Sequence, residues 1–280
     1  MPAPISIGCQ PATPKMKPSL QTRLRTIFSP AARAERAEIA RLAALPKYAG
    51  TVTRLLGPEL QVTDGQSFVA AYRAYFQKES YRFPATSPTP LIIDGGANVG
   101  VGVRYWKRLH PTARVIAFEC DPASFAALQR NTADLHDVTL RPEALWTENG
   151  TMEFAAVGAD GGHLTAVGTG NRPPQTLRVS ATRLRDLLTE PVDLLKLDIE
   201  GAETDVLLDC HDRLSCVRHL FVEYHSFADR PQRLGLFFGA LEQAGFRVHA
   251  HPDCWSQQPF ISCPVSNGKD FRLNVFCFRP

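Results

Sequence analysis

The chain has 280 residues, of which 44% are hydrophobic and 21% are charged, and its formal net charge is +3. This length and apolar content suit one large α/β domain with a buried core, and they exclude a chain that is disordered throughout. Because the lysines and arginines are dispersed rather than gathered in a run, a nucleic-acid partner is not expected.

The first part of the chain differs in composition from the rest. Residues 1–19 contain five prolines and few side chains that could pack, which predicts a disordered tail. Residues 20–85 are expected to form a helical or lid segment, and residues 86–280 the main domain. No run of 18 apolar residues and no secretory signal occurs, so the protein is expected to be cytoplasmic and without a membrane partner.

The most informative turn follows a buried strand, Leu-Ile-Ile at 91–93. The strand runs into Asp94 and a turn that contains Gly96, Asn98 and Gly100, and a helix is expected directly after it. Glycines let the backbone approach a ligand, and the start of a helix offers N–H groups to a carboxylate or phosphate. The spacing is not the G-x-G-x-x-G of dinucleotide sites, and Asp94 would repel a pyrophosphate but suit an amino group.

An acid ends the next strand. Glu119 follows the apolar run 114–118 and lies about 20 residues beyond the turn, where a carboxylate binds both hydroxyls of an unphosphorylated ribose. An amino group, a sulfonium and a free ribose occur together in S-adenosylmethionine. The two motifs therefore predict S-adenosylmethionine as the cofactor.

A third strand is expected over 138–145, followed by an antiparallel pair over 152–157 and 176–180. The segment between the members of this pair is rich in glycine, and a long loop of that kind is typically disordered or acts as a lid. His163 lies in this segment. It is a candidate for substrate binding, the alternative being a solvated loop residue.

The fourth strand, 192–199, departs from the pattern of a buried strand. Lys196, Asp198 and Glu200 fall at alternate positions and so point to the same side. Buried charges are costly unless they pair with one another or line a cavity. A cleft position is expected for Asp198 and Glu200, because ligands of open α/β sheets bind outside the carboxyl ends of the strands. For Lys196, an ion pair that braces the strand is an equal alternative.

The fifth strand, 217–225, ends in the same way. Glu223 and His225 alternate onto one side at its carboxyl end. Two adjacent strands that finish with acidic or imidazole groups predict a catalytic rim. Glu223 and His225 are therefore candidates for contact with the substrate.

Three segments, in this order, resemble the signatures of the FkbM family of S-adenosylmethionine-dependent methyltransferases. They are Asp-Gly-Gly-Ala-Asn-Val-Gly at 94–100, Ala-Phe-Glu-Cys-Asp-Pro at 117–122 and Leu-Lys-Leu-Asp-Ile-Glu-Gly-Ala-Glu at 195–203. The resemblance implies a class I methyltransferase fold, which is an α/β, Rossmann-like, seven-stranded and mostly parallel sheet with helices on both faces, here with an N-terminal helical extension. It also implies that Tyr81 and Asp198 lie near the cofactor, and that Glu143 and Ala144 hold the adenine.

Methyl transfer from a sulfonium requires alignment, exclusion of water and, for a hydroxyl acceptor, a base. His225 is the first candidate for the base, since the unperturbed pKa of histidine lies near neutral pH, and Glu200 is the second. Glu223 or Asp198 would orient His225, and Asp198 and Lys196 complete the catalytic set. The acids could also hold Mg²⁺, which is possible but not favoured, because the three motifs do not require a metal.

The resemblance implies O-methylation of a small molecule, a saccharide or a secondary metabolite, through a hydroxyl or a carboxyl group. Two other classes are alternatives. A non-catalytic module that binds S-adenosylmethionine or a nucleotide is disfavoured by the ionisable residues at the ends of the fourth and fifth strands. An NAD-dependent oxidoreductase is disfavoured by the missing G-x-G-x-x-G. The N-terminal helices are expected either to cover the substrate mouth as a lid or to mediate a homodimer.

Overall fold

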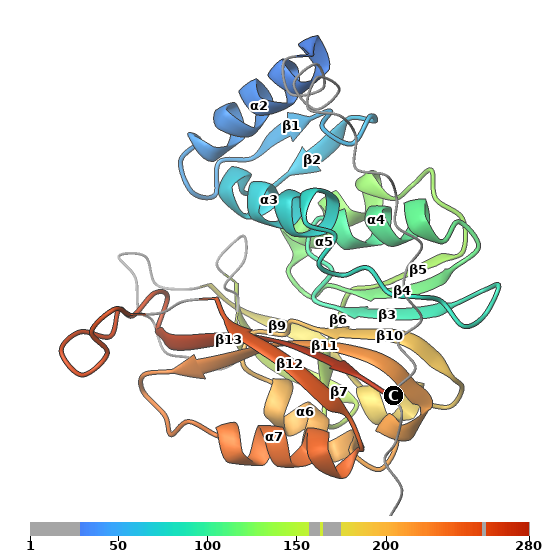
Figure 1. Cartoon of the computed structure of the whole chain (residues 1–280), viewed down its shortest axis with the longest axis vertical. Coiled ribbons are helices and arrows are strands. Elements are labelled where there is room, and N and C mark those ends of the chain that lie inside the picture. Colours follow the sequence, from blue (N-terminus) through green and yellow to red (C-terminus); the bar gives the residue numbers. More distant parts are fainter. Residues whose placement is uncertain (1–28, 157–162, 165–174, 254–255, 280) are drawn as a thin grey trace, which may run out of the picture.

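The computed structural model describes residues 29–156, 163–164, 175–253 and 256–279 (Figure 1). The tail predicted over 1–19 lies outside the described residues, as does most of the glycine-rich segment around His163. The described residues form a large central sheet with helices on both faces, a smaller second sheet and an N-terminal extension.

The central sheet has the strand order β12-β13-β11-β10-β3-β4-β5, and β13 runs antiparallel to both of its neighbours. The remaining pairs are parallel. The predicted seven-stranded, mostly parallel sheet of a class I methyltransferase is therefore confirmed. The strands are β3 (Leu91–Gly95), β4 (Arg114–Phe118), β5 (Val138–Arg141), β10 (Val192–Leu197), β11 (Val217–Phe227), β12 (Arg247–Pro252) and β13 (Lys269–Phe278).

Helices cover both faces of the central sheet, α4 and α5 on one and α6 and α7 on the other (Figure 1). Successive residues of a strand point to opposite faces, so Ile92 packs in the core beneath α4 and α5, whereas Ile93 packs in the core beneath α6 and α7. Both side chains are fully buried. The helices are α4 (Val101–Leu109), α5 (Pro122–Asn131), α6 (Glu203–Cys210) and α7 (Leu234–Gln243).

The single strand predicted over 138–145 is two strands in the structure. β5 ends at Arg141 in the central sheet, and β6 (Glu143–Trp146) begins a second sheet of order β6-β9-β7-β8. Pro142 lies between them, and its missing N–H prevents it from continuing a hydrogen-bonded ladder. The predicted antiparallel pair is confirmed by β7 and β9. The other strands of this sheet are β7 (Gly150–Ala156), β8 (His163–Leu164) and β9 (Gln175–Arg183).

The described part of the N-terminal extension combines helices with a small hairpin. Its second helix, α3, continues directly into a π-helical turn, η1, and turns of that kind occur frequently at functional sites. Its elements are α2 (Pro30–Ala43), β1 (Thr51–Thr53), β2 (Leu60–Val62), α3 (Gly65–Tyr72) and η1 (Arg73–Gln77). Two short 3₁₀ turns in the main domain complete the fold, η2 (Leu184–Leu187) and η3 (Leu214–Cys216).

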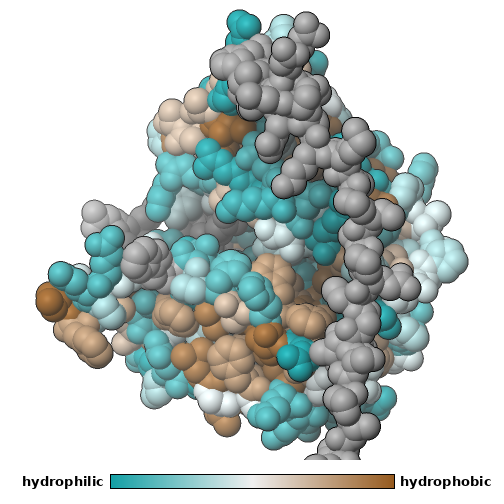
Figure 2. All heavy atoms as spheres, viewed as in Figure 1, coloured by the Kyte–Doolittle hydropathy of each residue, from teal (hydrophilic) through white to brown (hydrophobic). Residues whose placement is uncertain are grey.

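No helix within the described ranges is long and apolar enough to cross a membrane. Among the described large hydrophobic side chains, the most exposed are Phe260, Ile261 and Val265, in the loop between β12 and β13 that projects from the sheet (Figure 1). Figure 2 shows this apolar surface at the tip of the loop. None of the three side chains lines the cavity at the strand ends.

One buried amide connects the N-terminal extension to the main domain. Asn131, at the end of α5, accepts a hydrogen bond from the N–H of Gln61 in β2 (2.7 Å) and donates to the carbonyl of the same residue (2.9 Å). Its amide also donates to the carbonyl of Val99 (2.7 Å), in the turn after β3. Asn131 thus fixes the extension next to the glycine turn.

We expect Asn131→Ala to lower the free energy of unfolding by about 2–4 kcal/mol, because it leaves buried partners of the amide unsatisfied at about 1–3 kcal/mol each. Chemical denaturation followed by circular dichroism measures the change. Gln129→Ala, on the exposed side of the same helix, is the matched control and should change stability by less than about 0.5 kcal/mol. Equal denaturation midpoints for the two variants would contradict this role of Asn131.

Candidate active site

A cavity of about 250 Å³ opens at the carboxyl ends of β3 and β10. These adjacent strands form the point at which the strand order reverses, where open α/β sheets bind ligands. Residues far apart in the sequence meet there. The wall includes Asp94, Gly96 and Asn98 from the end of β3 and the glycine turn; Lys196 from β10 and Asp198 and Glu200 directly after it; Glu223, Arg272 and Asn274 from β11 and β13; and Ser67, Phe68, Tyr75 and Tyr81 from the N-terminal extension.

The glycine turn packs directly on the segment that follows β10. Gly96 has φ +82°, and a Cβ placed on it would lie 1.9 Å from the carbonyl oxygen of Asp198, so only glycine fits there. Asn98 also has positive φ (48°), and its N–H donates to Glu119 Oε2 (2.8 Å). Gly100 is left-handed as well and forms the N-cap of α4. The turn is therefore held by contacts with two neighbouring strand ends.

Lys196 is a buried brace for this arrangement. Its Nζ donates to the carbonyls of Gly96 (2.9 Å) and Gly95 (3.3 Å), and it lies 3.2 Å from Asp94 Oδ1 and 3.6 Å from Asp198 Oδ2. Burial acts to lower the pKa of Lys196, but the two carboxylates hold that pKa above its ordinary value. The ammonium group therefore stays charged and ties the turn to β10, in agreement with the bracing ion pair.

Glu119 lies beside the turn but does not line the cavity. Its Oε1 accepts from the N–H of Asp121 (2.8 Å), and its Oε2 accepts from Asn98. Burial raises the pKa of Glu119 to about 7, although both N–H donors act to lower it. The carboxylate keeps lone pairs for a further partner, since each oxygen accepts more than one hydrogen bond.

Three other predicted site residues lie in the second sheet, and of these Glu143 and Ala144 do not line the cavity. Glu143 is bound by Arg141 (2.7 Å) and by the hydroxyl of Thr182 (3.1 Å), and Ala144 is buried in β6. The backbone of His163 pairs with β7. Their roles toward adenine and substrate stay predictions.

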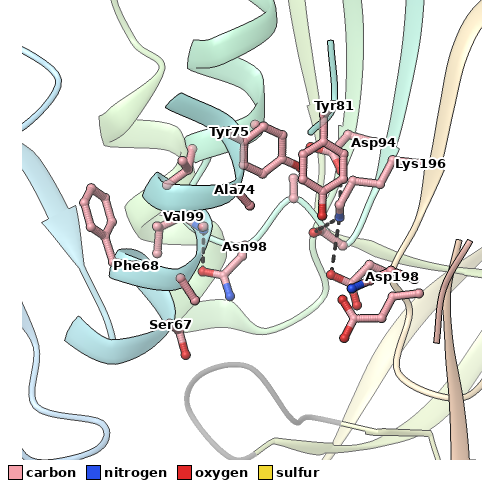
Figure 3. Close-up of a pocket in the computed structure, with 18 of the residues that line it drawn as sticks. Ser67, Phe68, Ala74, Tyr75, Tyr81, Asp94, Asn98, Val99, Lys196 and Asp198 are labelled. Carbon is pink, nitrogen blue, oxygen red and sulfur yellow. Dashed lines mark hydrogen bonds and ion pairs between the residues drawn. The ribbon is translucent and has the colours of Figure 1, made fainter. Parts of the chain in front are cut away.

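Figure 3 shows the remaining residues around the cavity. Asn98 lies between Ser67 and Phe68 of the extension on one side and the Lys196–Asp198 pair on the other. The rings of Tyr75 and Tyr81 stack at 4.1 Å between centroids, and both line the cavity. The position of Tyr75 in the cavity wall was not predicted from the sequence, because an aromatic residue in a helical stripe is typical of a core position.

His225 lies behind the cavity rather than in its wall. Its ring is 1% exposed; Nδ1 lies 2.9 Å from Glu203 Oε1, and Nε2 lies 3.6 Å from Glu223 Oε1 and 3.8 Å from Glu200 Oε2. Burial acts to lower the pKa of His225, but the three carboxylates raise it well above 6.5. As an inaccessible imidazolium without a free lone pair, His225 is poorly placed to be the base predicted from the sequence.

Glu203 organises the turn that presents Glu200. Its buried carboxylate accepts from the N–H groups of Ile199 (3.1 Å) and Gly201 (3.0 Å), and Glu200 between them has φ +60°, which is unfavourable for a residue with a side chain. Lys269 of β13 bonds to the Glu200 carboxylate. Sequence reasoning missed the role of Glu203, because an acid in the first turn of a helix is commonly a partner of the helix dipole.

Asp198, Glu200 and His225 place their ligand atoms within 4.8 Å of one another, close enough to hold a metal ion. Mg²⁺ prefers oxygen ligands in near-octahedral geometry. Here Lys269 is already bonded to Glu200, and Nδ1 of His225 lies 2.9 Å from Glu203 Oε1. These groups thus form an ion-pair network in the structure, and the Mg²⁺ site considered from the sequence stays a prediction.

A family model described as "Methyltransferase FkbM domain" matches residues 94–248. Methyltransferase sdnD of Sordaria araneosa is 28% identical over 249 residues, which cover 72% of this chain and 94% of that protein. The 2-O-methyltransferase NoeI of Sinorhizobium fredii is 29% identical over 155 residues; the match covers 49% of this chain and 64% of NoeI, which is less than two thirds. The crystal structure of Methyltransferase FkbM from Methylobacillus flagellatus aligns with TM-score 0.46 and 13% identity, over 88% of this chain and 59% of that one.

We expect His225 to remain protonated above neutral pH, and ¹⁵N NMR of histidine-labelled protein measures this directly. Its contribution to stability should be complete below pH 6.5, the ordinary value for histidine, and should be lost only as the pH rises through the raised pKa of the folded state. His225→Gln assigns the resonance. Glu203→Gln should lower the pKa by removing one carboxylate. Titration of His225 near pH 6.5 in the unmodified protein would contradict the buried imidazolium.

Proposed function

Because the chain belongs to the FkbM methyltransferase family, we propose that it transfers the methyl group of S-adenosylmethionine to an oxygen atom of a small organic acceptor. The observation that carries the proposal is one cavity at the switch point of the sheet, lined by the glycine turn, by the acids that follow β10 and by Glu223 of β11. The name of the relative NoeI, a 2-O-methyltransferase, supports oxygen as the acceptor atom.

The residues around the cavity fit this cofactor. Among the described residues, Asp94 Oδ1 is buried and accepts no hydrogen bond, although Lys196 Nζ lies 3.2 Å away, and it would hold the ammonium group of the amino acid moiety. Glu119 would hold the ribose hydroxyls. When bound, S-adenosylmethionine supplies an activated methyl group on a sulfonium. The acids of the cavity suit that positive charge.

The proposed base is Asp198. Its side chain lines the cavity and is 29% exposed, so a hydroxyl group can reach it. Burial and the neighbouring Glu223 raise the pKa of Asp198 to about 8, against the effect of Lys196, and a base works best when its pKa lies near the working pH. A cationic cofactor beside it would lower this value toward neutrality.

Glu200 is the weaker candidate for the same role. Burial acts to raise the pKa of Glu200, but His225 and Lys269 lower it below its ordinary value. A carboxylate that is tied into two ion pairs accepts a proton less readily than Asp198 does. We assign Glu200 instead to shaping the negative wall of the cavity, and the stacked pair Tyr75 and Tyr81 to excluding water from it.

We expect Gly96→Ala to abolish binding of S-adenosylmethionine in isothermal titration calorimetry, because the added Cβ would displace either the turn or Asp198. Gly239→Ala, on α7 with open space around its Cβ, is the matched control and should bind normally. The unmodified protein should bind S-adenosylmethionine and S-adenosylhomocysteine but not NAD. Binding of NAD alone, or equal affinities in the two variants, would contradict the proposed cofactor site.

We expect Asp198→Asn to retain S-adenosylmethionine and to slow methyl transfer by about 10²-fold or more, since the amide cannot take the proton of a hydroxyl acceptor. In the unmodified protein, the rate should rise with pH and level off above the pKa of Asp198, which is about 8 without the cofactor and lower beside it, because the base acts in its ionised form. Transfer of tritium from methyl-labelled cofactor into a deproteinised cell extract, with EDTA present, measures both effects.

Glu190→Gln, which removes an exposed acid at the amino end of β10, is the control and should transfer at the normal rate. A normal rate for Asp198→Asn would show that Asp198 is not the base. Loss of transfer in EDTA would show that the reaction requires a metal ion.

A further inference from the structure

We propose that the methyl acceptor is an uncharged or cationic hydroxyl compound, and not a carboxylic acid or a phosphate ester. The inference rests on the proposed function, because it concerns the molecule that shares the cavity with the cofactor. Its basis is that every cationic side chain in the described cavity wall already has carboxylate partners.

Arg272 is the cation of β13 that lines the cavity. Its Nη2 lies 2.5 Å from Asp253 Oδ2, and its Nη1 lies 3.5 Å from Glu223 Oε1. Both acids also line the cavity. An anionic acceptor would have to displace one of these carboxylates and leave it uncompensated in a partly buried site, which is unfavourable.

Lys196 is the second cation of the cavity wall, and it cannot serve an anionic acceptor either. Its Nζ is already shared between two backbone carbonyls and the carboxylates of Asp94 and Asp198, and the residue is buried. Its protons are directed at the two carbonyls, and its charge is balanced by the two carboxylates. If Lys196 left these partners to bind an anionic acceptor, the glycine turn would lose its hydrogen bonds to the lysine.

Two further cations lie close to the acids but outside the cavity wall. Lys269 is buried and bonded to Glu200, and the imidazolium of His225 is enclosed by Glu200, Glu203 and Glu223. Both side chains balance the negative charge of these acids from positions outside the cavity wall. Neither presents a charge to a molecule in the cavity.

The cavity wall itself is acidic. Among the residues that the structure describes, it contains six carboxyl side chains and only Lys196 and Arg272 as cations, the acids being Asp64, Asp94, Asp198, Glu200, Glu223 and Asp253. Carboxylates accept hydrogen bonds and cannot donate them when ionised, so they are suited to hydroxyl and ammonium groups. A carboxylate or a phosphate on the acceptor would instead be repelled by the like charge of these acids. The acceptor chemistry that the wall favours is therefore a hydroxyl on a neutral or amino-bearing molecule.

The test uses the full chain and charge-separated acceptors. A deproteinised extract of the source cells is divided at pH 7 by ion exchange into cationic, neutral and anionic fractions, and each is incubated with S-adenosyl-L-[methyl-³H]methionine. Label in the neutral and cationic fractions should exceed label in the anionic fraction about tenfold or more, the discrimination expected from like-charge repulsion. The label should survive mild alkali, because methyl ethers are stable and methyl esters release methanol.

Asp198→Asn is the control for transfer at this site and should strongly reduce the label. Predominant label in the anionic fraction, or labelled methanol after alkali, would overturn the acceptor class. So would the absence of label from the neutral and cationic fractions with a protein that binds the cofactor. Failure of the proposed function itself is distinguishable, since calorimetry would then detect no binding of S-adenosylmethionine.

Discussion

The arrangement of the whole site depends on one buried ammonium group. Lys196 bonds to the carbonyls of Gly95 and Gly96 while facing Asp94 and Asp198, so a single cation joins the glycine turn to the end of the neighbouring strand. Without it, two carboxylates and two carbonyls would face one another at low dielectric, which is strongly unfavourable. The close approach at Gly96 makes the same junction intolerant of any side chain. The proposed cofactor site and the proposed base therefore lie at a junction whose geometry is fixed by these contacts.

A second network of ion pairs, centred on β11 and β13, gives the acids of the site different pKa values. Glu200, Glu203 and Glu223 surround His225, and Lys269 and Arg272 complete their ion pairs. These partners hold the pKa values of Glu200 and Glu223 below the ordinary value, whereas the pKa of Asp198 is raised, because burial and Glu223 outweigh the effects of Lys196 and His225. Environment therefore separates carboxylates of similar chemistry into structural anions and one potential base. The same networks leave the cavity acidic, with its cations engaged.

Much of the fold and part of the candidate site could be predicted. The alternation of buried strands and helices predicted the central sheet, and the polar residues at strand ends were expected to gather at one edge, where Asp94, Asp198, Glu200 and Glu223 do line one cavity. The break at Pro142 was missed, because continuous β-propensity concealed a change of sheet. Arg272 and Tyr75 were missed as well, since cross-strand register and the packing of a distant helix bring them to the cavity.

The sequence by itself determined the family, the parallel α/β plan and the identity of the groups at the strand ends, because periodicity and motif spacing are local properties of the chain. Only the tertiary structure decided what those groups can do. Histidine was the natural base by its ordinary pKa, but His225 is enclosed by three carboxylates, while Asp198 is the acid with a raised pKa that faces the cavity. Protonation depends on burial and on distances between charges, and both are set by residues remote in sequence.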